Sequence, residues 1–157
     1  MSTVLVGVDG SPGAETALRW ALDEARLRGA TLHVVYVWRL PLYATAPEPA
    51  LAGAPPFHAA LDEEFEEAMA REAQGVLNRC TDGIEREAEE LEVEVRAEAI
   101  RGNPAHVLVG LANDADLLVV GSRGHGGFAG LLLGSVSQQC VQHSPCPTVV
   151  VRIPRQG

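Results

Sequence analysis

The sequence has few cysteines, and their positions exclude a disulfide framework. Three cysteines stand among 157 residues, at Cys80, Cys140 and Cys146, and no two of them form a Cys-x-x-Cys pair. An odd and sparse set of this kind is typical of a reducing compartment. No histidine pattern of zinc-site spacing accompanies them, so we expect small, buried, apolar side chains at all three positions.

Positive charge and aromatic residues are also scarce. The chain carries 12 basic and 21 acidic residues, a formal net charge of −9, and only 4% aromatic residues. Nucleic acids and anionic membranes both require a basic footprint, and no arginine-rich run exists here, so we expect neither as a partner. The core must be built mainly from alanine, valine and leucine.

Long hydrophobic runs are absent as well. The opening Met1-Ser2-Thr3 leads into an apolar run that is too short for a signal sequence or a membrane span. We therefore expect a cytoplasmic protein. A chain of this length fits one domain with one core, which we expect to cover residues 1–157.

Short apolar runs alternate with amphipathic stretches along the chain. This alternation predicts an α/β protein with an open parallel sheet and helices on both of its faces. Ser11-Pro12 and Asn103-Pro104 have the form of a capping residue followed by a proline in the first helical turn, and Gly29 is a helix stop. The expected strands are Val4–Val8, Thr31–Trp38, Val93–Ala99, Asp116–Val120 and Pro147–Val151, and the expected helices are Pro12–Arg28, Leu61–Leu91, Pro104–Ala112 and Ser135–His143.

Two segments between these elements have distinct patterns. Residues 39–60 contain five prolines and predict a mobile surface loop, with a functional lid as the alternative. In the long acidic helix Leu61–Leu91, Gly75 and Gly83 are candidate breaks or kinks. The strict alternation of Val93–Ala99 indicates one solvated face and therefore an edge strand.

The segment from Gly121 to Ser137 carries the chemistry. Glycines leave backbone N–H groups open to close approach by an anion, and a helix N-terminus attracts phosphate through its unpaired N–H groups and partial positive charge. The loop leaves the carboxyl end of a parallel strand, where ligands bind in open α/β sheets. Its glycines are Gly121, Gly124, Gly126, Gly127, Gly130 and Gly134, and Ser135 and Ser137 add hydroxyls.

The loop is neither of two common phosphate-binding motifs. It lacks the Gly-Lys-Ser/Thr of a Walker loop, and no Gly-x-Gly-x-x-Gly follows the first strand. The spacing Gly121, two residues, Gly124, nine residues, Gly134-Ser135 resembles the ATP-binding signature G-2x-G-9x-G-(S/T) of the universal stress protein family. The opening Val-Asp-Gly-Ser and the ending Cys146-Pro147 with its valine run are similar to that family too.

The resemblance implies a fold and a set of site residues. It implies a five-stranded sheet in the order 3-2-1-4-5, Rossmann-like and similar to the adenine nucleotide alpha hydrolases. It also implies a site for ATP, with Mg²⁺ at Asp9 as an option and no catalytic residue. The positions that match the family's nucleotide contacts are Gly7, Asp9, Val37, Val120, Gly121, Gly124, Gly134, Ser135, Val136 and Ser137.

Several of these positions have a second interpretation. Asp9 could be a turn residue before the Ser11 cap, Val37 a core residue and Ser135 a helix cap. Arg123 and His125 are tempting phosphate partners, but we expect both on a solvated part of the loop and outside the core of the site.

Three functions remain open at this stage. The first is an ATP-binding regulator of stress response or growth, as the family resemblance implies. The second is a slow ATPase or phosphotransferase, although the loop has no lysine and His125 is its only candidate base. The third is a nucleotide-free protein-interaction module. The apolar last strand, Thr148–Val151, further predicts a homodimer that pairs two such edges.

Overall fold

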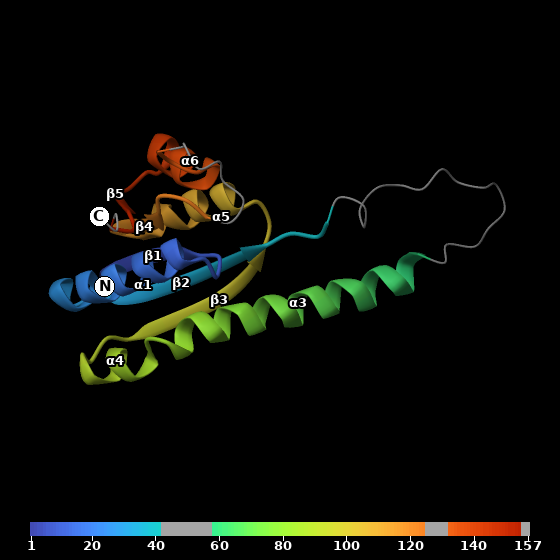
Figure 1. Cartoon of the computed structure of the whole chain (residues 1–157), viewed down its shortest axis with the longest axis horizontal. Coiled ribbons are helices and arrows are strands. Elements are labelled where there is room, and N and C mark those ends of the chain that lie inside the picture. The colour runs from blue at the N-terminus through green and yellow to red at the C-terminus, as the bar shows by residue number, and fades with distance from the viewer. Residues whose placement is uncertain (42–57, 125–131, 155–157) are drawn as a thin grey trace.

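The computed structural model describes residues 1–41, 58–124 and 132–154. Five parallel strands form one sheet in the order β3-β2-β1-β4-β5 (Figure 1), which confirms the predicted fold class and strand order. The strands are β1 (Thr3–Val8), β2 (Thr31–Trp38), β3 (Val95–Arg101), β4 (Leu117–Gly121) and β5 (Thr148–Val151). Most of the predicted loop at residues 39–60 lies outside the described residues.

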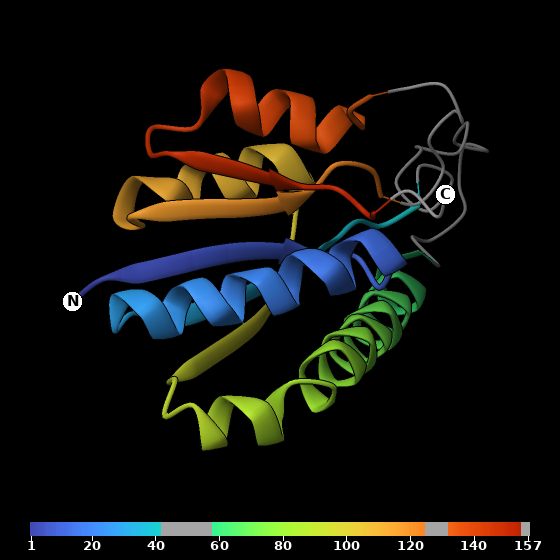
Figure 2. The same cartoon turned by 60° about the vertical axis from the view of Figure 1, so that its left-hand side comes forward.

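Helices cover both faces of this sheet, as expected. On one face lie α1 (Pro12–Arg28), α3 (His58–Asp82) and the short α4 (Glu85–Glu90) (Figures 1 and 2). The other face carries α5 (Pro104–Leu111), which continues as a 3-10 turn over Ala112–Asp114, and α6 (Ser135–His143). This division follows from right-handed crossovers that run outward from β1 to β3 and then return to β4 and β5.

The predicted caps are present at two helix starts and one helix end. The Ser11 hydroxyl accepts from the Ala14 N–H at 3.2 Å, and the Asn103 side chain accepts from the His106 N–H at 3.1 Å. Gly29 ends α1 with φ of 60°, a left-handed conformation that glycine adopts without steric penalty. These local signals fix the directions in which α1 and α5 leave the sheet.

The long acidic helix differs from its prediction at both ends. It begins at His58, inside the segment expected to be a loop, and it stops at Asp82, so that a separate α4 follows. Of the two glycines, Gly75 lies within α3 and Gly83 lies at the break. The chain turns there because Ile84 enters the core, where only 2% of its surface remains exposed.

The third strand begins two residues later than predicted, at Val95. The Val93 N–H donates to the Ala88 carbonyl at 2.9 Å, and Glu92 takes a left-handed φ of 55°. This hydrogen bond closes the C-terminal end of α4, which spans Glu85–Glu90. The Val93 N–H is thus used at the helix end and does not start the strand. As predicted, β3 is an edge strand of the sheet and has exposed charged residues.

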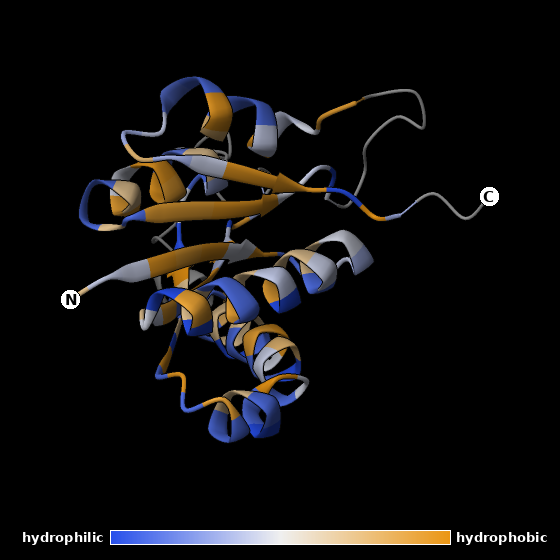
Figure 3. Ribbon diagram, turned by 90° about the vertical axis from the view of Figure 1, so that its left-hand side faces the viewer, coloured by the Kyte–Doolittle hydropathy of each residue, from blue (hydrophilic) through white to orange (hydrophobic). Residues whose placement is uncertain are grey.

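Two apolar clusters fill the space between the sheet and its helices. The α1/α3 side is centred on Val4, Val6, Leu18 and Leu77, and the α5/α6 side on Leu5, Val35, Leu108, Leu118 and Cys140. Successive residues of a strand point to opposite faces, which explains how β1 serves both clusters. Figure 3 shows the apolar strands between helices whose charged faces turn outward. Among the described residues, no helix is both long and apolar enough to cross a bilayer.

The buried thiol of Cys140 generates a prediction about alkaline stability. Cys140 has no exposed surface, and its burial raises the pKa of the thiol from 9.0 to about 11. The unfolded chain therefore loses this proton first, so the free energy of unfolding falls as pH rises from about 9 to about 11. A shift of this size corresponds to about 3 kcal/mol in total.

Denaturant titrations of wild type, Cys140→Ala and Cys146→Ala at about pH 8 and about pH 10.5 measure this effect. Cys140→Ala is expected to lower stability at both pH values and to flatten the alkaline decline. Cys146→Ala is the control, because the Cys146 side chain is only half-buried and packs at the margin of the cluster that encloses Cys140. An equally steep decline in all three proteins would contradict the assignment.

Candidate functional site

The carboxyl ends of β1 and β4 lie side by side at the centre of the sheet. These two strands pair in parallel, with Val6 beside Val119. After β1 the chain turns to the α1/α3 face, and after β4 it leads to α6 on the other face. The strand order therefore reverses here, and such switch points are where open α/β sheets bind ligands.

Asp9 follows β1 and is held by the start of α1. Its Oδ1 accepts a hydrogen bond from the Ser11 N–H at 2.9 Å and another from the Ser11 hydroxyl. Ser11 is 5% exposed and at the same time caps α1, so the carboxylate has a fixed anchor. Asp9 is therefore a turn residue, as one of the two interpretations from the sequence has it, and its role in binding a ligand stays a prediction.

The second oxygen of this carboxylate lies against the glycine loop. A Cβ atom added at Gly124 would overlap Asp9 Oδ2, so only glycine fits beside the carboxylate without a shift. Gly134 closes the same corner, because a Cβ there would lie 3.4 Å from Arg123 Cα and 3.7 Å from the Gly124 nitrogen. Asp9, Gly124 and Gly134, which are far apart in the sequence, are thus brought together.

The backbones of β4 and α1 also touch directly. A Cβ on Gly121 would come within 3.0 Å of the Gly13 carbonyl oxygen, and a Cβ on Gly13 would come within 2.9 Å of the Arg123 carbonyl oxygen. Both contacts are with backbone, which cannot rotate away as a side chain can. The exit of β4 is therefore packed onto the first turn of α1 with no space for a methyl group.

The carbonyl of Ser122 ties the two ends of the glycine loop together. It accepts from the Gly134 N–H at 2.6 Å and from the Ser137 hydroxyl at 2.9 Å. Ser137 is 2% exposed, so its hydroxyl proton serves the protein framework. The Ser122 N–H in turn donates to the Val151 carbonyl at 2.9 Å, which links the loop to β5.

The first turn of α6 has no side-chain cap, unlike α1 and α5. Gly134 stands at its capping position and offers no side-chain acceptor. Among the described residues, nothing accepts a hydrogen bond from the N–H groups of Ser135 and Val136. Ser135 is exposed, and Val136 is half-buried against the α5/α6 cluster. A helix start of this kind is suited to an anion.

Three further predicted positions share the α5/α6 face of the sheet. Val37 packs against the apolar cluster of that face, and Val120 is part of it with 3% of its surface exposed. Gly7 lies under α5, since a Cβ there would come within 2.6 Å of Leu108 Cδ1. The missing side chain of Gly7 thus leaves room for Leu108.

The pKa of Tyr36, near the end of β2, is affected by the charge of Asp9. Burial raises the pKa of its hydroxyl, and the negative charge of Asp9 raises it further, while Arg79 lowers it. The corner between the ends of β1 and β2 is therefore only partly solvated and carries a negative charge at Asp9.

Some of the predicted residues lie outside the described part of the chain. Two features of the site were not predicted from the sequence. His125, Gly126, Gly127 and Gly130 are not described. Gly13 was not predicted, although a glycine within the first turn of a helix is a weak helix former and could have signalled a close contact. The Ser122 carbonyl has no sequence signal, because every residue carries one.

The described side chains do not form a complete set of ligands for a metal ion. Within residues 1–41, 58–124 and 132–154, no three His, Cys, Asp or Glu side chains are arranged to hold one. Asp9 can at most supply a single carboxylate to an ion that has its other ligands elsewhere.

Comparison with known sequences gives consistent matches over almost the whole chain. The model of the universal stress protein family matches residues 1–152. Universal stress protein Rv1996 of Mycobacterium tuberculosis is 38% identical over 152 residues, which is 97% of this chain and 44% of that protein. A universal stress protein of Thermus aquaticus is 34% identical over 96% of this chain and 98% of its own length. The chain thus spans less than half of the mycobacterial relative.

Solved structures agree in fold. A universal stress protein from Lactobacillus plantarum has a TM-score of 0.69 at 24% identity, covering 96% of this chain and 97% of that one. A universal stress protein in complex with cAMP has a TM-score of 0.62 at 26% identity and 96% coverage of each. An Arabidopsis thaliana member with AMP bound has a TM-score of 0.60 at 21% identity, covering 98% and 93%. The chain belongs to the universal stress protein family.

Proposed function

We propose that this chain binds ATP at the switch point between β1 and β4 and acts as a nucleotide-dependent regulator of stress response or growth. The observation that carries the proposal is the uncapped first turn of α6, which stands next to the corner formed by Asp9, Gly124 and Gly134. Relatives with this fold hold cAMP and AMP, which supports an adenine nucleotide as the ligand class.

The residues present fit a phosphate chain that is held mainly by backbone. The sequence contains no lysine, so the cationic residue of a Walker loop has no counterpart here. The N–H groups of Ser135 and Val136, from which no described residue accepts a hydrogen bond, supply the positive potential instead, together with the dipole of α6. Glycine at 124 and 134 adds no side chain to the corner beside the Asp9 carboxylate, so that backbone and ligand can approach closely.

Other residues are assigned to the remaining parts of the ligand. Gly7 and Val37 would contact the adenine, and Asp9 would contact the ribose or a Mg²⁺ ion that the phosphates bring. Val120 and Gly121 would border the nucleotide at the end of β4. The Ser137 hydroxyl, which donates to Ser122, acts by holding the loop and leaves its backbone N–H for the ligand.

Regulation, and not turnover, is the activity that this site supports. Phosphoryl transfer needs charge stabilisation and a residue that orients the attacking water, and the described part of the site offers only the Asp9 carboxylate. ATP acts here as a ligand that stabilises one conformation or assembly. The assembly that we propose is a homodimer through β5, whose outer edge is unpaired within the described chain.

The glycine corner can be tested with Gly124→Ala. The added Cβ meets Asp9 Oδ2, so the loop or the carboxylate must shift, and we expect ATP affinity to fall by about tenfold or more. Isothermal titration calorimetry measures the affinity. Gly110→Ala is the matched control, because nothing lies within 4 Å of a Cβ at that helical position. Equal affinity in wild type and Gly124→Ala would contradict the proposed corner.

Turnover can be tested separately with purified protein and ATP in the presence of Mg²⁺. We expect retention of ATP with no saturable release of phosphate, because no described residue is positioned to activate water. Saturable hydrolysis that is lost in Asp9→Ala would instead establish an ATPase. Mass spectrometry of the nucleotide that copurifies with the chain identifies the ligand in the same preparation.

The dimer can be tested through the outward-facing amides of β5. The carbonyls of Pro147 and Val151 bond to β4, so by alternation the N–H of Val150 points to the free edge. Val150→Pro removes this donor and leaves the bonds to β4 in place, so we expect it to convert a dimer to a monomer in light scattering. Val150→Thr retains the donor and is expected to remain dimeric. A monomeric wild type at micromolar concentration would refute the dimer.

A further inference from the structure

A cavity lies on the opposite side of the sheet from α5 and α6. It has a volume of about 450 Å³ and extends from the turn after β1 into the space between α1 and α3. Val8, Leu18 and Ile84 line it with apolar surface and belong to the buried cluster of that side. Its size falls within the range of small-molecule sites in proteins, about 300–1,000 Å³.

This cavity is distinct from the proposed nucleotide site. Val37 and Val120 belong to the α5/α6 face, and Gly7 lies under α5 on that face. The cavity instead draws on α1, α3 and the α1/α3 face of β1. The two sites share only the turn Asp9–Ser11, where Asp9 Oδ1 is already bonded to Ser11.

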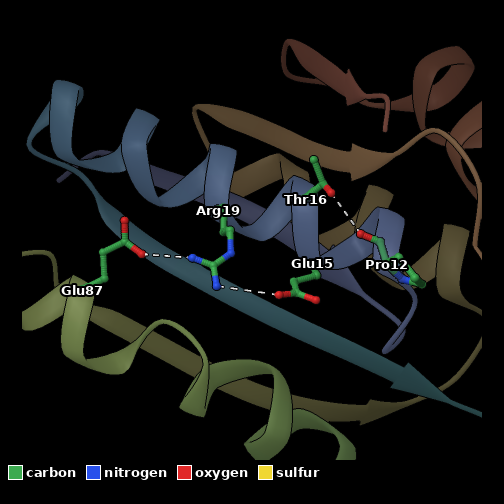
Figure 4. Close-up of polar contacts among 5 residues, drawn as sticks. All are labelled: Pro12, Glu15, Thr16, Arg19 and Glu87. Atoms are coloured by element: carbon green, nitrogen blue, oxygen red, sulfur yellow. Dashed lines mark hydrogen bonds and ion pairs between the residues drawn. The ribbon is translucent and has the colours of Figure 1, made fainter. Parts of the chain in front are cut away.

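Two arginines from different helices border the cavity, and only one of them is paired with carboxylates of the described chain. Arg19 of α1 lies between two carboxylates, with 3.7 Å to Glu15 and 3.3 Å to Glu87 (Figure 4). Arg79 of α3 makes no side-chain hydrogen bond or ion pair with any described residue. A guanidinium at the border of an apolar cavity, without a carboxylate partner, is suited to an anionic group.

The wall also holds two carboxylates, and both have partners: Glu15 lies 3.7 Å from Arg19, and Asp9 accepts hydrogen bonds from the N–H and the hydroxyl of Ser11. Cys80 lies next to Arg79 in sequence and lines the cavity. Burial raises the pKa of this thiol, so it stays protonated near neutral pH and presents a polarisable apolar surface. The cavity thus combines the apolar side chains of Val8, Leu18 and Ile84 with an arginine, Arg79, that no described carboxylate neutralises.

We propose that this cavity binds a small organic anion, with its apolar body between α1 and α3 and its acidic group at the Arg79 guanidinium. A carboxylate, sulfonate or phosphate head would meet the same requirement, since each accepts two parallel N–H donors from arginine. The body must be compact and apolar, because Val8, Leu18 and Ile84 offer it no hydrogen-bonding side chain.

Anilinonaphthalene sulfonate is a suitable probe, because it has an aromatic body, one sulfonate and fluorescence that rises in apolar surroundings. We expect saturable binding of one molecule per folded chain in the presence of saturating ATP. Phenylnaphthylamine, which has a similar body and no charge, is the matched probe. It is expected to bind more weakly to the wild-type chain.

Variants separate the role of the charge from that of the cavity. Arg79→Gln is expected to weaken the sulfonate probe by about tenfold and to leave the uncharged probe unchanged. Arg71→Gln removes an exposed arginine of the same helix that does not line the cavity, and it is expected to bind both probes as wild type does. Val76→Phe places a ring in the cavity and is expected to abolish binding of both probes.

Thermal unfolding shows whether each variant is folded, and Arg79→Gln keeps the test valid if Val76→Phe does not fold. The proposal is overturned if the sulfonate probe binds equally to wild type and Arg79→Gln. Displacement of the probe by ATP in a one-to-one manner would also overturn it, since the probe would then occupy the nucleotide site. Failure of ATP binding itself would leave the probe measurements unaffected.

Discussion

The contact between two stretches of backbone determines how this molecule is built around its site. The exit of β4 lies on the first turn of α1, with Gly121 and Gly13 in contact and no room for a methyl group between them. Because backbone atoms cannot rotate aside, this contact sets the distance between the glycine loop and the turn that carries Asp9. The position of the Asp9 carboxylate beside Gly124 then follows from the same packing.

Most of the fold could be predicted because its signals are local. Ser11-Pro12, Asn103-Pro104 and Gly29 each act within one helical turn, and the structure has caps at all three places. The break at Gly83 could not be chosen over Gly75, because the choice depends on burial of the next residue, Ile84, in a core formed by distant parts of the chain. Local pattern therefore identified most of the elements, and tertiary packing decided where the long helix breaks and α4 begins.

The candidate site was predictable as a set of positions and much less as a set of contacts. Glycine spacing identified Gly121, Gly124 and Gly134, and the structure places Gly124 beside Asp9 and Gly134 beside Gly124. The reasons for glycine at these positions include close contacts with the protein itself, which a motif cannot reveal. Neither the partner of Gly121, which is Gly13, nor the carbonyl that joins the loop ends has any side-chain signature.

The Ser122 carbonyl has a consequence for the thermodynamics of ligand capture. Its bonds to the Gly134 N–H and the Ser137 hydroxyl hold the base of the loop closed in the folded chain. Bringing two chain ends together reduces conformational entropy, by an amount that grows slowly with the number of residues between them. Here the entropy of joining the two ends of the loop is lost when the chain folds, so a ligand that binds at this base does not have to offset that loss on association.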